Sequence, residues 1–93
     1  MSNVVTTKLI NGEELISKFE GEESEDHVVL IDPLVLHMMQ SHQGAQIVLV
    51  PWMHSKPRGR FLVDKNHILA TAETDKQYSD GYLSQVSGIQ LSA

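Results

Sequence analysis

A cluster of positive charge late in the chain is the first feature that could do chemistry. Four of the seven basic residues fall within ten positions, namely Lys56, Arg58, Arg60 and Lys65. Lys and Arg neutralise phosphate, so this stretch could bind an anion or RNA, with Trp52 and Phe61 nearby to stack on bases. A solvated loop, or pairing with an acidic loop of a neighbouring copy, explains the same charges. For the two aromatic residues, a place in the core or an interface is the alternative.

A cluster of negative charge precedes it in the sequence. Glu20–Asp26 holds five acids in seven residues. Such a block repels itself and buries little surface, which predicts a solvated hairpin tip. Carboxylates also bind calcium, but this block has neither the alternating ligand order nor the central glycine of an EF-hand loop.

Three histidines could converge on a metal ion. His37, His42 and His54 flank the loop between two adjacent predicted strands, and imidazole is a ligand of zinc. The chain has no cysteine to complete such a site. We therefore interpret these residues as surface or strand-end histidines and expect no bound metal.

Composition narrows the classes of protein further. Ninety-three residues make one domain, and 41% hydrophobic with 20% charged residues is ordinary for a folded chain. A net charge of −5 argues mildly against nucleic-acid binding, and the absence of cysteine favours a cytoplasmic protein. The apolar runs are far shorter than the roughly 20 residues of a membrane helix, so no membrane partner is expected. Neither a nucleophile with catalytic spacing nor a Gly-rich phosphate loop is present, so we expect no enzyme and no cofactor.

Short apolar stretches separated by turn residues predict an all-β domain. The expected strands are Val4–Ile10, Glu14–Glu20, His27–Asp32 continued by Leu34–Met39, and Gln46–Met53. Asn11-Gly12 predicts a type I′ hairpin turn after the first strand. Alternation in the second strand predicts that Leu15 and Phe19 face inward. Pro33 has no N–H to donate, which predicts an edge position or a bulge.

The segment Arg60–Glu73 organises the predicted fold. Two apolar runs, Phe61–Val63 and Ile68–Ala70, flank Asp64–Asn66, which is short enough to form a sharp bend between two strands. The preceding strands are expected to pair with this segment.

Residues 74–88 predict a C-terminal helix. Thr74-x-x-Gln77 fits a capping box, and an apolar stripe over Asp75–Ser87 is expected to pack against the strands. The stripe consists of Tyr78, Tyr82 and Val86. Gly88 suits the position after the helix, and Ile89–Ala93 is interpreted as frayed or as a swapped last strand.

These elements, in this order, resemble the Sm-like (LSm) fold. The resemblance rests on KLINGEELISKFEG at 8–21 and FLVDKNHILAT at 61–71, joined by DPLVL and VPWM. It covers about residues 5–87, and the combined pattern resembles small Sm-like proteins of marine bacteriophages and environmental sequences. It implies a small, strongly bent barrel of five to six strands, here with a C-terminal helix, and a bacterial host if the chain is viral. Residues 46–53 fit either the fourth barrel strand or an insertion before it.

The resemblance implies a homo-oligomer. Sm-like domains close rings by pairing the strand before the sharp bend with the last strand of a neighbour, and a strand with open backbone groups is a template for such pairing. The candidate interface residues are Phe61, Leu62, Val63, Ile68, Leu69 and Ala70.

The same resemblance argues against RNA binding of the usual Sm kind. RNA-binding members read bases with an Asp and an Asn in the loop here formed by Glu20–Asp26, and with the Arg of the closing Arg-Gly motif. This loop has no Asn, and Asp64-Lys65 replaces Arg-Gly, leaving Asn66. We therefore expect a non-enzymatic, ring-forming interaction or scaffold module. The alternative is an RNA-binding protein that uses 56–65, with contacts from Lys56, Arg58, Arg60, Lys65 and Asn66.

Overall fold

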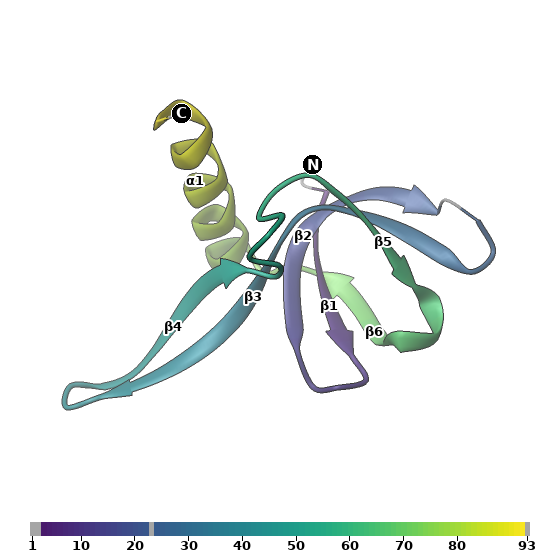
Figure 1. Ribbon diagram of the computed structural model, residues 1–93. Coiled ribbons are helices and arrows are strands. Elements are labelled where there is room, and N and C mark those ends of the chain that lie inside the picture. The colour runs from purple at the N-terminus through teal and green to yellow at the C-terminus, as the bar shows by residue number, and fades with distance from the viewer. Residues whose placement is uncertain (1–2, 23, 93) are drawn as a thin grey trace.

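The computed structural model describes residues 3–22 and 24–92 of the chain. It is mainly β, with six antiparallel strands and one C-terminal α-helix. The elements are β1 (Val4–Leu9), β2 (Glu14–Glu22), β3 (His27–Ser41), β4 (Gly44–Pro51), β5 (Arg60–Asp64), the 3-10 turn η1 (Lys65–His67), β6 (Ile68–Glu73) and α1 (Lys76–Ser92). Figure 1 shows the strands curled into a small open barrel, with α1 on the side where the β3–β4 hairpin leaves it. The predicted all-β, strongly bent architecture with a C-terminal helix is confirmed.

The long strand β3 is the backbone of the sheet. The strand order is β4-β3-β2-β1-β6, and β5 pairs with β3 as well. Residues 27–31 of β3 pair with β5, and residues 34–41 pair with β4. β4 and β5 therefore lie one after the other along β3, and the loop 52–59 connects them. The stretch 46–53 thus belongs largely to the fourth barrel strand, because β4 lies along β3.

A bulge bends β3 in the middle. Two of its residues, Asp32 and Pro33, stand opposite the single residue Ser17 of β2, as the register shift in that ladder requires. Asp32 has a φ of 51°, in the left-handed region that few residues other than glycine adopt. The bulge predicted from Pro33 is therefore confirmed, and it turns the two halves of β3 toward different parts of the molecule.

The β1–β2 hairpin forms where predicted, but with a different turn. The amide of Gly12 donates to the carbonyl of Leu9, and the amide of Leu9 donates to the carbonyl of Glu13, both at 2.9 Å. Gly12 has a φ of 95° whereas Asn11 has a negative φ. A type I′ turn needs φ above zero at both positions, so that prediction is wrong. The hydrogen bonds fit a type I turn followed by a glycine bulge.

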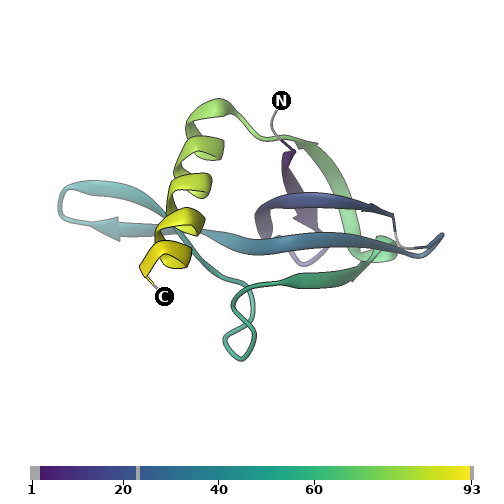
Figure 2. The same ribbon diagram turned by 90° about the horizontal axis from the view of Figure 1, so that it is seen from above.

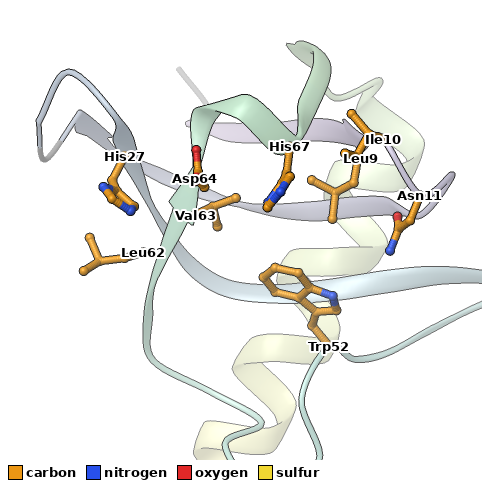
Figure 3. Close-up of a pocket in the computed structure, with 9 residues that line it drawn as sticks. All are labelled: Leu9, Ile10, Asn11, His27, Trp52, Leu62, Val63, Asp64 and His67. Atoms are coloured by element: carbon orange, nitrogen blue, oxygen red, sulfur yellow. The ribbon is translucent and has the colours of Figure 1, made fainter.

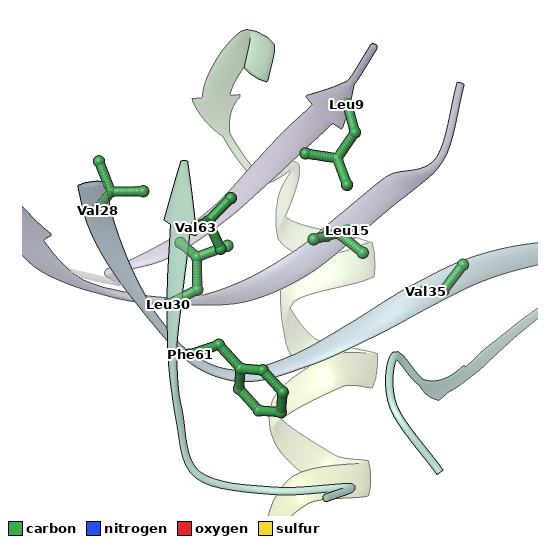
Figure 4. Close-up of a cluster of buried hydrophobic side chains, with 7 residues drawn as sticks. All are labelled: Leu9, Leu15, Val28, Leu30, Val35, Phe61 and Val63. Carbon is green, nitrogen blue, oxygen red and sulfur yellow. The ribbon is translucent and has the colours of Figure 1, made fainter. Parts of the chain in front are cut away.

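Two hydrophobic clusters lie on the two faces of the sheet. The cluster inside the barrel, drawn in Figure 4, consists of Leu9, Leu15, Val28, Leu30, Val35, Phe61 and Val63. The cluster under α1 consists of Val4, Ile16, Leu34, Tyr82 and Val86. Leu15 and Ile16, adjacent in β2, thus belong to different clusters. Leu15 faces inward as predicted, but Phe19 is 38% exposed and lines a hollow beside Thr71 of β6, because β2 shifts register just beyond it.

The helix follows its predicted stripe but not its predicted ends. The carbonyl of Asp75 accepts from the amides of Tyr78 and Ser79, at 3.1 and 2.9 Å, so the first helical hydrogen bonds start there. The hydroxyl of Thr74 instead bonds the hydroxyl of Thr6 at 2.8 Å, and the predicted capping box is wrong. The helix also continues past Gly88 to Ser92, because a glycine costs about 1 kcal/mol of helix propensity but does not by itself end a helix. Of the two interpretations of Ile89–Ala93, frayed or a swapped last strand, the strand is therefore wrong as far as Ser92, and Ala93 lies outside the described residues.

Candidate functional site: the open strand edges

β4, β5 and β6 each have one unpaired edge among the described residues, and the edges of β5 and β6 flank the bend at η1. β5 pairs only with β3, and β6 pairs only with β1. They lie at opposite ends of the sheet, so the two open edges face different directions. Unpaired N–H and C=O groups on a strand edge readily accept another strand. These two edges therefore each expose backbone groups that have no partner strand among the described residues.

The short turn η1 fixes the angle between the two edge strands. The carboxylate of Asp64 accepts from the amide of Asn66 at 2.8 Å and caps the turn. The amide of Lys65 donates to the carbonyl of Asp26 at 2.8 Å, and the amide of Ile10 donates to the carbonyl of His67 at 2.9 Å. The sharp bend predicted at Asp64–Asn66 is thus held on both sides by neighbouring loops.

The six predicted interface residues divide into two groups. Phe61 and Val63 are buried in the barrel core, and Ile68 is half-buried against it. Leu62 and Leu69 are 62% and 66% exposed, and Ala70 is exposed as well. Their role in an interface stays a prediction, and only the exposed group has side chains free to contact a neighbour.

A cavity of about 520 Å³ lies beside β5. Figure 3 shows the indole of Trp52 on one side of it and Leu9, Asn11 and His67 on the other. The indole N–H of Trp52 donates to Glu13 at 3.2 Å, and its ring lies 6.0 Å from that of Phe61. Trp52 therefore packs in the wall of the barrel as a structural aromatic residue.

Three of the four clustered basic residues are paired with acids of the same chain. Arg60 makes two hydrogen bonds to the carboxylate of Glu20, at 2.9 and 3.1 Å. The hydrogen bond from Arg60 holds the pKa of Glu20 below its ordinary value. Lys65 lies 3.2 Å from Glu22. Acidic residues of β2 thus pair with basic residues of β5 and η1, although the two groups lie far apart in the sequence.

Arg58 is the third of these residues, and it is structural. Its Nε lies 3.5 Å from the carboxylate of Asp32, and its Nη2 donates to the carbonyl of Val86 at 3.2 Å. It therefore joins the bend of β3 to the helix. Only Lys56 of the cluster is exposed without an ionic partner in the described part of the chain, and Asn66 is exposed in η1.

Sequence reasoning missed the polar contacts that join β3 to α1. The hydroxyl of Tyr82 donates to the carbonyls of Asp32 and Ile31, and the burial of that hydroxyl raises its pKa. The dipeptide Asp32-Pro33 was the available signal, since it marks the bulge that bends β3. The partner, Tyr82, lies fifty positions away in the sequence, and no local pattern could identify it.

The histidines do not come together as a metal site. His37 lies on the outer part of β3, His42 at the tip of the hairpin and His54 in the loop after β4, and all three are exposed. Across the described residues, no three His, Asp or Glu side chains are placed to hold a metal ion.

Within residues 3–22 and 24–92, no helix combines the length and the apolar character that a membrane span needs.

A family model described as "Sm_like domain" matches residues 6–83, which include every strand except the first two residues of β1, and the first half of α1. No curated protein matches the sequence.

Proposed function

Because this chain belongs to the Sm-like domain family, we propose that it is a non-enzymatic interaction or scaffold protein whose copies assemble into a ring. In the proposed ring, β5 of each copy pairs with β6 of the next. The observation that most directly supports this pairing is that β5 and β6 each have an open edge, at opposite ends of the sheet. A contact between two different surfaces leaves one of each unfilled until a ring closes.

Exposed side chains on the edge strands support this pairing. All residues from Leu69 to Glu73 are exposed, which is unusual for a strand that closes a barrel. Leu62 of β5 and Leu69 of β6 are among the most exposed large apolar residues. Covering them against a neighbour would remove apolar surface from water, at about 25 cal/mol for each Å² buried.

Charge supports an antiparallel arrangement of the two strands. In that arrangement the start of β5 lies against the end of β6 of the neighbouring copy. Lys56 and Arg60 would then approach Glu73 and Asp75 of the neighbour. Lys56, Glu73 and Asp75 have no ionic partner among the residues that the structure describes, so the contact would pair charges that are otherwise open.

RNA binding through the stretch 56–65 has weaker support. Arg58, Arg60 and Lys65 already contact acids of the same chain. Phosphate would have to compete with these carboxylates, and the surrounding acidic loop would repel it. Assembly is therefore the function that the geometry favours.

Cysteine cross-linking tests the proposed contact on a clean background, because the natural chain has no cysteine. Leu62→Cys combined with Ala70→Cys would place one thiol on each open edge. Mild oxidation should produce a ladder of covalent multimers from this variant and none larger than a dimer from either single variant. Leu62→Cys with Ser84→Cys on α1 is the matched control. If the control gives the same ladder, or if neither Ala70→Cys nor Ala72→Cys links to Leu62→Cys, the β5–β6 contact is wrong.

A further inference from the structure

The outer part of the β3–β4 hairpin forms an arm, defined here as residues 37–48, that projects away from the barrel (Figure 2). No Asp, Glu, Lys or Arg occurs anywhere from Pro33 to Ser55, although charged residues make up 20% of the chain. The arm is therefore an uncharged projection on an acidic protein. Nothing in the β5–β6 contact uses it.

The arm exposes apolar side chains that the barrel does not cover. Met38 and Met39 are 62% and 55% exposed, and Ile47 opposite Met38 is 39% exposed. A two-stranded ribbon without further packing is only marginally stable in water. An additional strand or surface against the arm would stabilise it.

The helix shows which backbone groups of β4 point outward. The side-chain amide of Gln85 donates to the carbonyl of Leu49 at 2.9 Å, so that carbonyl points away from β3. Backbone groups of alternate residues in a strand point the same way. The N–H and C=O groups of Ile47 and Ala45 therefore also point away from β3. α1 contacts this edge at Leu49, a hollow separates α1 from Ile47, and Ala45 beyond it is exposed.

We propose that the arm binds the arm of a second copy of this chain. The two β4 edges pair antiparallel about a two-fold axis at Gln46. In this register, Ala45 of each copy faces Ile47 of the other, and each such pair exchanges two backbone hydrogen bonds. Gln46 faces its own counterpart across the axis. The contact needs no backbone group that Gln85 already occupies.

The missing charge favours a second copy over other occupants. The titratable side chains of the arm are His37 and His42, and it offers no Lys or Arg to phosphate or to anionic lipid. It also offers no charged group to a charged protein partner. An identical uncharged arm is complementary to it, because it brings the same open edge and no repulsion.

This contact differs in symmetry from the proposed ring contact. The arm contact joins identical surfaces about a two-fold axis, whereas the β5–β6 contact joins different surfaces around a ring. With the two-fold axes perpendicular to the ring axis, the two contacts together give a particle of two rings, with twice the subunits of one ring. Each contact can therefore be removed without the other.

A charge swap at Gln46 tests the arm contact. The mass of the full chain is measured by light scattering for Gln46→Asp, for Gln46→Lys and for their equal mixture. Each single variant places like charges directly across the axis, and the mixture places opposite charges there. The particle mass should fall by half in each single variant and return to the wild-type value in the mixture. Equal masses in all four samples, or no recovery in the mixture, would overturn the proposal.

A second variant separates this result from the ring. Leu62→Glu with Leu69→Glu charges both edges of the β5–β6 contact and leaves the arm intact. It should leave a dimer of about twice the 10.4 kDa chain. If the ring proposal fails, the wild type is itself this dimer and Gln46→Asp is a monomer. If this variant is monomeric, or if the arm binds neutral phosphatidylcholine vesicles instead, the arm proposal fails while the ring stands.

Discussion

The hydroxyl of Tyr82 donates a 2.7 Å hydrogen bond to the main-chain carbonyl of Asp32. Asp32 is the residue at which β3 bends, with a φ of 51°, and its carboxylate accepts from the amide of Gly59 at 2.7 Å. One residue therefore joins the helix, the central strand and the loop that leads into β5. The position of the open edge of β5 depends on these contacts.

Tyr82→Phe should lower the free energy of unfolding by about 1 to 3 kcal/mol, because the buried carbonyl of Asp32 loses its donor. Urea unfolding followed by circular dichroism measures the change. Tyr78→Phe is the matched control, since Tyr78 is only half-buried beside the same cluster. Equal losses in the two variants would mean that the hydroxyl of Tyr82 contributes nothing.

Alkaline pH should also weaken the protein through Tyr82. Burial, with a further contribution from the charge of Asp32, raises the pKa of Tyr82 above the ordinary value of 10.0. The folded state thus favours the neutral phenol. Its contribution is complete below pH 10 and is lost as the pH rises beyond that value. The free energy of unfolding, measured between pH 9 and 12, should fall more steeply in the wild type than in Tyr82→Phe. Parallel curves would contradict this account.

Arg58→Ala should destabilise the fold by about 2 kcal/mol, because it leaves the carboxylate of Asp32 buried without its cation. Lys56→Ala, two positions earlier, should change stability by less than about 0.5 kcal/mol, since that side chain is exposed. Thermal unfolding of both variants makes the comparison. Similar losses of stability at the two positions would mean that Arg58 contributes no more to stability than an exposed cation.

RNA binding should be weak or absent at low salt. Fluorescence anisotropy with U-rich and A-rich oligonucleotides measures it. Glu20→Gln with Glu22→Gln is the informative variant, because it removes the carboxylate charges beside Arg60 and Lys65. The variant should bind more tightly than the wild type and lose that gain as salt rises. Tight, salt-dependent binding by the wild type would favour RNA over assembly as the function of the 56–65 stretch.

Local patterns predicted the strands, the bend at Asp64–Asn66 and the helical stripe, because each depends on residues a few positions apart. The turn at Asn11-Gly12 was placed correctly although its type was not, since a three-residue loop and a two-residue loop begin with similar residues. At Gly88, by contrast, the local pattern predicted a helix end where the structure has none. Its low helix propensity was overcome, and local preference alone could not predict the end of α1.

The candidate site was harder to predict, because its charges pair across the sheet. Arg60 and Lys65 looked free in the sequence, but the barrel brings them to Glu20 and Glu22. Phe61 and Leu62 are adjacent in sequence yet lie on opposite faces of β5, so only one of them is available to a neighbour. The alternation within β5 is local, whereas the ion pair between Arg60 and Glu20 joins residues forty positions apart, which no short motif encodes.

The mass of the wild-type particle at high protein concentration tests the central claim most directly. Native mass spectrometry or light scattering should give a multiple of 10.4 kDa that corresponds to a closed ring, or to two rings if the arms also pair. A protein that remains a 10.4 kDa monomer at all concentrations would contradict the proposal that the open edges of β5 and β6 join one copy to the next.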